Sequence, residues 1–131
     1  MSRVDSPATR HTALVVDDDP GVQGLFFTLL GREGFSVFSA RDGRMAFESI
    51  KRGSYSVILL DLMMPDVNGF ELLERLHRES PSLLRRVIVV TGASQTLVDS
   101  IDASRVWKIV RKPFDINDLV RESKACALGR Y

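Results

Sequence analysis

The sequence predicts an α/β protein built on one open, parallel β-sheet with helices on both faces. Short apolar segments alternate with longer segments whose apolar residues recur at helical spacing, which is typical of consecutive βαβ units. Residues 12–17, 56–61 and 85–92 each contain four consecutive apolar residues, as expected of strands that are covered on both sides. The chain has 131 residues, which suits a single domain with a sizeable core.

Five strands and five helices are expected in strict alternation. The expected strands are residues 12–17, 35–40, 56–61, 85–92 and 106–112, and the expected helices are residues 19–34, 41–53, 69–80, 94–104 and 114–129. The first strand, TALVVD, is apolar and β-branched, and the first helix can begin with Asp19 as its N-cap and Pro20 as its first residue. The second strand, FSVFSA, alternates with period two, like a strand with one buried face.

The later elements differ in the strength of their patterns. The second helix carries Met45, Ala46 and Ile50 at helical spacing, and the third helix is clearly amphipathic and ends before Pro81. The fourth helix has poor apolar periodicity and is expected to be short. The fifth strand, VWKIVRK, and a last helix complete the five units, with right-handed crossovers between the parallel strands.

Composition and charge narrow the possible functions. A formal net charge of +1 provides no general attraction to nucleic acid or to a membrane surface. The single cysteine, Cys126, excludes an internal disulfide framework and favours a reducing, cytoplasmic compartment. The first ten residues lack the apolar stretch of a signal peptide. We expect residues 1–11 to form a flexible N-terminal arm before a single domain at residues 12–131.

Polar residues that could take part in catalysis or metal binding stand at the carboxyl ends of four expected strands. They are Asp17 with its neighbour Asp18, then Asp61, Thr91 and Lys112. In open parallel sheets this edge is where sites form, so these distant residues are expected to converge. Neighbouring carboxylates repel one another unless a cation joins them, and hard oxygen ligands suit Mg²⁺ or Mn²⁺. A nucleophile, a metal and cationic groups together are what phosphoryl transfer requires.

Four sequence motifs carry these residues: LVVDDDP, VILLDLMMPDVNG, VIVVTG and RKPF. Each motif is weak alone, but four in order at the expected strand ends are specific. Together they resemble the receiver domain of bacterial two-component response regulators, in its single-domain, chemotaxis-regulator-like form. The resemblance extends from about Ala13 to Ala127. It implies a flavodoxin-like, doubly wound (βα)5 fold with strand order 2-1-3-4-5.

The resemblance also implies roles for the clustered residues. Asp61 matches the residue that accepts a phosphoryl group from a histidine kinase or a histidine phosphotransfer protein. Asp17 and Asp18 match the acidic pair that holds Mg²⁺, or Mn²⁺, together with Asp61 and the backbone carbonyl of Met63. Such a domain catalyses its own phosphorylation and dephosphorylation, and the chain is therefore not expected to be a turnover enzyme.

The remaining roles concern the signal and its readout. Thr91 matches the hydroxyl that follows the phosphoryl group, and Lys112 matches the invariant lysine of the family, whose bond to the next residue, here Pro113, is commonly cis. The resemblance places the downstream effector on the face formed by the fourth helix, the fifth strand and the fifth helix. No direct binding of nucleic acid or membrane is expected, and the chain is expected to be a monomer or a weak dimer.

The fifth strand departs from the family pattern. Many receivers carry Tyr or Phe three residues before the lysine, and this chain has Ile109 there. Strand alternation predicts that Trp107 lies on the same face as Ile109. We therefore hypothesise that Trp107 takes the place of the usual aromatic residue in reporting the switch, or that no residue does so.

Two other functions remain open at this point. A phosphatase of the haloacid-dehalogenase type would use the Asp-x-Asp pattern of Asp17 and Asp19, but Gly21 stands where such enzymes carry Thr or Val, and Asp61 would have no role. A phosphorylation-independent interaction module on the same fold is the second alternative, because fold alone does not settle function.

Overall fold

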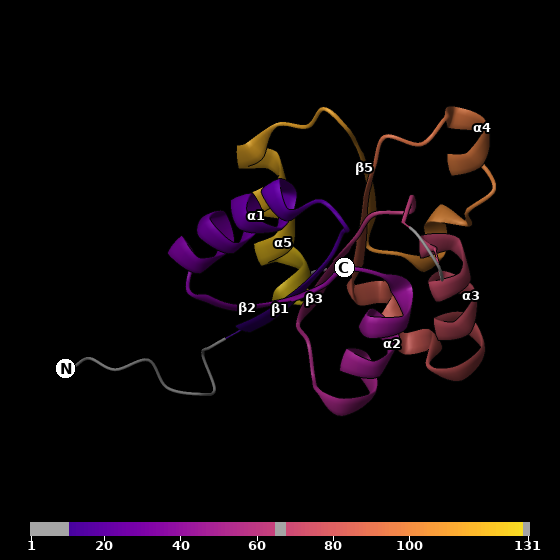
Figure 1. The fold of residues 1–131 in the computed structure, drawn as a ribbon, viewed down its shortest axis with the longest axis horizontal. Helices are drawn as coiled ribbons and strands as arrows, with labels where there is room; N and C mark the ends of the chain where they lie inside the picture. The colour runs from indigo at the N-terminus through magenta and orange to yellow at the C-terminus, as the bar shows by residue number, and fades with distance from the viewer. Residues whose placement is uncertain (1–10, 65–67, 130–131) are drawn as a thin grey trace.

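The computed structural model describes residues 11–64 and 68–129 and has the predicted α/β architecture (Figure 1). In this part of the chain, five parallel strands form one sheet in the order β2-β1-β3-β4-β5. The strands are β1 (His11–Val16), β2 (Phe35–Ala40), β3 (Val57–Leu60), β4 (Val87–Thr91) and β5 (Lys108–Arg111). The predicted strand order is therefore confirmed.

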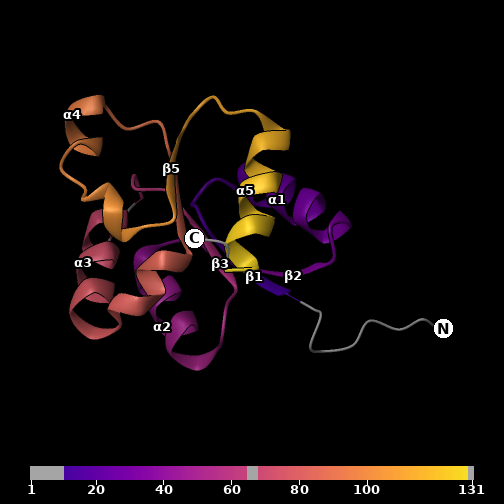
Figure 2. The same cartoon turned by 180° about the vertical axis from the view of Figure 1, so that it is seen from behind.

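Helices cover both faces of the sheet. Figures 1 and 2 show α1 and α5 on one face and α2 and α3 on the other. The helices are α1 (Pro20–Arg32), α2 (Gly43–Arg52), α3 (Gly69–Glu79), α4 (Gln95–Val98) and α5 (Ile116–Ala127). Two 3-10 segments, η2 (Pro81–Arg86) and η3 (Ala103–Arg105), precede β4 and β5. Among the described residues, no helix is long and apolar enough to cross a membrane.

The core explains why the central strands are apolar at consecutive positions. Ala13 and Val15 of β1 pack into a cluster with residues of α1 and α5, whereas Leu14 and Val16 pack into a cluster with residues of α2 and α3. All four side chains are at most 1% exposed. A strand buried on both faces has no polar side, and the central strands β1, β3 and β4 therefore carry polar residues only at or just beyond their ends.

Each α-helix begins with a side-chain cap. The five N-caps are Asp19, Asp42, Asn68, Ser94 and Asp115, and each accepts a hydrogen bond from a backbone N–H in the first turn. Such caps satisfy donors that the helix itself leaves unpaired. The expected start of α1, with its cap followed by proline, is confirmed. These caps fix where the loops that follow the strands give way to helices.

Several boundaries differ from the expectations. β1 begins at His11, inside the range expected for the N-terminal arm, because His11 continues the pairing with Phe35 of β2. Residues 1–10 lie outside the described part of the chain. The fourth helix is short, as expected, but it covers only Gln95–Val98 of the expected residues 94–104, and the 3-10 segment η3 lies at the end of that range. The 3-10 segment η2 was not expected. It begins at Pro81, and only Ser80 separates it from the end of α3.

Candidate functional site

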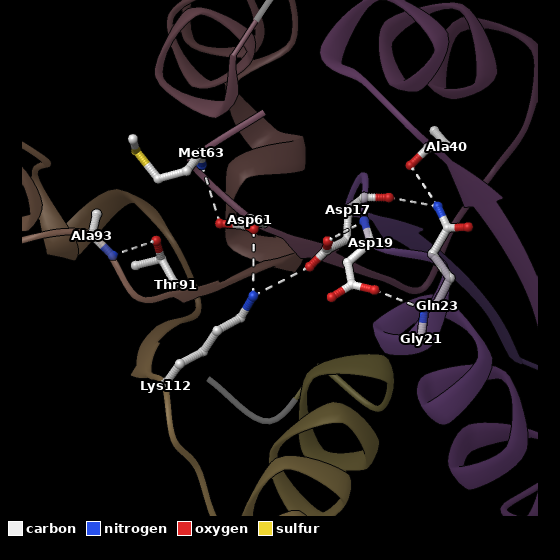
Figure 3. A network of polar contacts seen from close by, with 10 residues as sticks. All are labelled: Asp17, Asp19, Gly21, Gln23, Ala40, Asp61, Met63, Thr91, Ala93 and Lys112. Atoms are coloured by element: carbon white, nitrogen blue, oxygen red, sulfur yellow. Dashed lines mark hydrogen bonds and ion pairs between the residues drawn. The ribbon is translucent and has the colours of Figure 1, made fainter. Parts of the chain in front are cut away.

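The carboxyl edge of the sheet brings the expected site residues together (Figure 3). Asp17, Asp61 and Lys112 each come one residue after a strand, and Thr91 is the last residue of β4. The strand order places β3 between β1 and β4. Asp61 therefore stands between Asp17 on one side and Thr91 on the other, as Figure 3 shows.

The position of Asp61 is set by its backbone. Its N–H donates to the carbonyl of Val16 at 2.9 Å, which extends the pairing of β3 with β1 by one residue. The backbone N–H of Met63 donates to Oδ1 of Asp61 at 3.1 Å. The residue is 8% exposed, so its carboxylate is oriented in a largely buried place rather than free in solvent.

Asp17 is held in the same way and is more deeply buried, at 3% exposure. Its Oδ1 accepts a hydrogen bond from the backbone N–H of Asp19 at 2.9 Å. Burial raises the pKa of the Asp17 carboxyl, because a desolvated charge is disfavoured. The bond from Asp19 and the charge of Lys112 oppose this rise in pKa, and the negative charge of Asp61 adds to it.

Lys112 joins the two buried carboxylates. Its Nζ lies 3.4 Å from Oδ2 of Asp17 and 3.4 Å from Oδ2 of Asp61. Burial by itself lowers the pKa of this amine, but the two negative charges outweigh burial, and the net pKa is raised. The lysine is therefore charged at neutral pH. The peptide bond between Lys112 and Pro113 is cis, as the resemblance implied.

The acidic residues form a group whose chemistry fits a divalent cation. Asp17, Asp18 and Asp61 each offer a carboxylate oxygen, and these oxygens all lie within 4.8 Å of one another. Asp18 is exposed, so the group opens to solvent. Lys112 offsets only part of the negative charge, and carboxylate oxygens are the ligands that Mg²⁺ prefers. The contribution expected from the carbonyl of Met63 stays a prediction.

Thr91 provides a buried hydroxyl beside the acidic group. The residue is 0% exposed, and its Oγ1 accepts a hydrogen bond from the backbone N–H of Ala93 at 3.1 Å. A hydroxyl that accepts one bond keeps its own hydrogen for donation. The role expected of this hydroxyl toward a transferred group stays a prediction.

Trp107 does not lie where strand alternation placed it. Its side chain packs against the cluster that includes α1 and α5 residues, and its indole Nε1–H donates to Oε1 of Glu122 at 3.0 Å. Ile109 packs against the opposite cluster. The expectation that both share one face is wrong because β5 begins at Lys108, and the alternation does not extend to the residue before the strand.

Gln23 also belongs to the site, although the sequence did not predict it. Its Nε2 donates to the carbonyl of Asp17 at 2.6 Å and to the carbonyl of Ala40 at 3.1 Å. Gln23 thereby ties the ends of β1 and β2 to the first turn of α1 and holds Asp17 in place. The available signal was a polar residue within a mainly apolar helix. Asp19 caps α1 through Gly21, as expected.

The fold and the acidic edge together define a doubly wound α/β protein with a carboxylate cluster that could hold a divalent cation. The protein-family model of the response regulator receiver domain matches residues 13–124 of the sequence. The chain belongs to this family, whose members act in two-component signalling, and the cluster of Asp17, Asp18 and Asp61 lies at the family's phosphorylation site. Receiver domains are signalling domains that work with histidine kinases and effectors.

Similar proteins include single-domain and multidomain regulators. The receiver protein CpdR of Brucella abortus is 32% identical over 110 residues, which cover 83% of this chain and 90% of CpdR. The probable transcriptional regulatory protein TcrX of Mycobacterium tuberculosis is 32% identical over 125 residues, or 95% of this chain. The chain spans only 52% of the length of TcrX.

Solved structures agree with the fold. A CheY-like receiver domain protein from Methanospirillum hungatei superposes with a TM-score of 0.83 at 25% identity, covering 93% of this chain and 97% of the other. The response regulator TrrA of Thermotoga maritima, solved in complex with Mg²⁺ and BeF, gives a TM-score of 0.77 at 26% identity, covering 88% and 98%.

Proposed function

We propose that this receiver domain accepts a phosphoryl group on Asp61 from a phosphohistidine of a histidine kinase or a histidine phosphotransfer protein. The observation that carries the proposal is the position of Lys112, which lies 3.4 Å from a carboxylate oxygen of both Asp17 and Asp61. A cation held between an acceptor and an acidic neighbour is ready to bind an incoming anionic group.

The chemistry follows from the residues around Asp61. A carboxylate oxygen of Asp61 attacks phosphorus, the P–N bond of the phosphohistidine breaks, and its electron pair stays on the imidazole nitrogen. Lys112 and the hydroxyl of Thr91 donate hydrogen bonds to oxygens of the transferred group.

The proposed metal ligands are the side chains of Asp17, Asp18 and Asp61 and the backbone carbonyl of Met63. Bound Mg²⁺, or Mn²⁺, supplies positive charge that neutralises the phosphoryl oxygens. A similar regulator, TrrA, was solved in complex with Mg²⁺ and BeF, which supports the choice of metal.

The modified aspartate acts as a switch. The phosphoryl group carries up to about two negative charges in place of the single charge of the Asp61 carboxylate, and these compete with Asp17 for Lys112. Repositioning of Lys112 and Thr91 shifts the loops that follow β4 and β5, and the effector reads the change on the face of α4, β5 and α5. Attack by water on phosphorus returns the carboxylate and releases phosphate. We propose a cytoplasmic monomer or weak dimer that binds neither nucleic acid nor membrane.

Acetyl phosphate with and without Mg²⁺ tests the proposal directly. The wild type should gain the mass of one phosphoryl group only when Mg²⁺ is present, and Asp61→Asn should gain none. Asp19→Asn is the matched control, because Asp19 caps α1 through the N–H of Gly21 and asparagine caps equally well.

Other outcomes would contradict the proposal. Modification that persists in Asp61→Asn would move the acceptor elsewhere. An unmodified wild type that still binds Mg²⁺ would favour the phosphorylation-independent interaction module. Turnover of a phosphomonoester that requires Asp17 would favour the haloacid-dehalogenase type of phosphatase.

A further inference from the structure

Gly69, the first residue of α3, lies directly on the backbone that carries the acceptor. Its N–H donates to the carbonyl of Leu62 at 3.0 Å, and the residue is buried. A Cβ atom built on Gly69 would lie 2.5 Å from Cα of Leu62 and 2.6 Å from the carbonyl oxygen of Asp61. Real Cβ atoms essentially never come within 3.0 Å of another heavy atom in this way, and both distances are shorter than that. A side chain at this position therefore requires the backbone of Asp61 and Leu62 to shift.

The reason for glycine here is space rather than backbone conformation. Gly34 and Gly129 are the described glycines with a positive φ, and Gly69 has a backbone that any residue can adopt. The atoms in the way belong to the main chain of Asp61 and Leu62, so no rotamer change can make room. By contrast, a Cβ on Gly24 of α1 meets no described atom within 4 Å.

The close contact completes the support of the acceptor. On one side, the N–H of Asp61 donates to Val16 of β1. On the other side, the first residue of α3 lies against the carbonyl of Asp61 and bonds to Leu62. Asn68 caps this end of α3, because its Oδ1 accepts a hydrogen bond from the backbone N–H of Glu71. The backbone of Asp61 is thus held between β1 and α3.

We propose that Gly69 is a positioning residue for phosphoryl transfer at Asp61, a role that rests on the function proposed above. Its missing side chain lets α3 begin against the backbone of Asp61 and Leu62, which sets the distance from the Asp61 carboxylate to Lys112 and to the acidic pair. A Cβ would push this backbone by roughly half an ångström, and a misplacement of about 1 Å can lower a rate about 100-fold.

The test compares Gly69→Ala with Gly24→Ala. Both changes add one methyl group near the start or middle of a helix, but only the first meets backbone atoms. We would measure the modification rate at saturating Mg²⁺ and acetyl phosphate, the Mg²⁺ affinity, the folded fraction from urea unfolding, and the ¹⁹F spectrum of the beryllofluoride complex. The ¹⁹F spectrum reports the surroundings of the bound group, which a purely structural role would not alter.

We expect Gly69→Ala to lower the saturated rate at least ~10-fold in the folded protein and to shift the ¹⁹F resonances. Gly69→Ser should behave like Gly69→Ala, since the obstacle is met at Cβ. Gly24→Ala should leave the rate and the spectrum unchanged. A folded Gly69→Ala protein with the wild-type rate would overturn the proposal, and so would a loss of rate that only follows the folded fraction.

If Gly69→Ala fails to fold, stabilising substitutions elsewhere in the chain provide a background in which it can be measured. Gly24 and Gly31 lie in α1, and a Cβ at either meets no described atom, so alanine at both stabilises the helix. Gly69→Ala is then measured in the Gly24→Ala, Gly31→Ala background against that background alone. Failure of the wild type to accept a phosphoryl group would instead refute the function proposed above, and the two failures are therefore distinguishable.

Discussion

Trp107 and Glu122 connect the start of β5 to α5. The indole Nε1–H donates to Oε1 of Glu122 at 3.0 Å, and the other carboxylate oxygen accepts from Nζ of Lys108 at 2.9 Å. Trp107 immediately precedes β5, Lys108 is the first residue of β5, and Glu122 lies in α5. This contact spans two of the elements on the proposed output face, and it turns Trp107 away from Ile109.

Replacing Glu122 by Gln should lower the free energy of unfolding by about 0.5 kcal/mol at pH 7, since solvent screens the half-exposed Lys108. The bonds from Lys108 and Trp107 lower the pKa of Glu122 below its usual 4.5. A lowered pKa stabilises the fold above the usual value, and the gain is lost as pH falls through the lowered pKa. Urea unfolding followed by Trp107 fluorescence should therefore show the difference shrinking below about pH 4.5.

The exposed pair of Glu48 and Lys51 in α2 is the matched control. Both side chains are about half exposed, and Glu48→Gln should change the stability by a few tenths of a kcal/mol at most, roughly within error. An equal effect of the two substitutions would mean that the contact of Glu122 with Trp107 and Lys108 contributes nothing specific.

Asp61→Asn should not destabilise the protein in Mg²⁺-free buffer, and we expect a gain of about 1 kcal/mol. The change removes a buried charge that repels Asp17, and Lys112 loses Asp61 but keeps its ion pair with Asp17 at 3.4 Å. The asparagine oxygen can still accept from the N–H of Met63. Adding Mg²⁺ should raise the urea midpoint of the wild type and leave that of the variant nearly unchanged, because a ligand stabilises only the state that binds it. Equal stabilisation of both proteins by Mg²⁺ would exclude Asp61 from the metal site.

Most of the fold, and the sheet edge at which the candidate site residues meet, could be predicted from the sequence for a physical reason. Strands such as Val57–Leu60 must be apolar when helices cover both faces, and their pattern is therefore visible in the sequence. Asp17 and Asp61 stand immediately after such strands, and Lys112 stands immediately after the edge strand β5. Parallel strands bring those positions to one edge.

Other features depend on contacts that no local pattern records. Trp107 precedes β5 and bonds to Glu122, fifteen residues away in the sequence. The short contact at Gly69 exists only once the start of α3 lies against the backbone of Asp61 and Leu62. The two bonds from Gln23 to strand ends likewise exist only once β1 and β2 are paired.

Thr91→Val should lower the free energy of unfolding by about 1–2 kcal/mol, although the two side chains have similar shapes. Valine removes the oxygen that accepts from Ala93 and leaves that N–H unpaired in a buried place. Thr91→Ser keeps the hydroxyl and should cost about 1 kcal/mol for the lost methyl group. Beryllofluoride binding should separate them, with serine near the wild-type affinity and valine at least ~10-fold weaker. Equal affinities would show that the hydroxyl does not contact the bound group.

Cys126 should be almost unreactive in the folded protein. It is 2% exposed, and burial raises the pKa of its thiol from 9.0 to about 12. The thiolate is the reactive form, so labelling with a disulfide reagent at pH 8 should be at least ~100-fold slower in buffer than in urea. The raised pKa also makes the fold lose stability as pH rises from about 9 toward 12, because only the unfolded chain ionises there. Cys126→Ala should lessen this alkaline loss, and fast labelling of the native wild type would show that α5 opens readily.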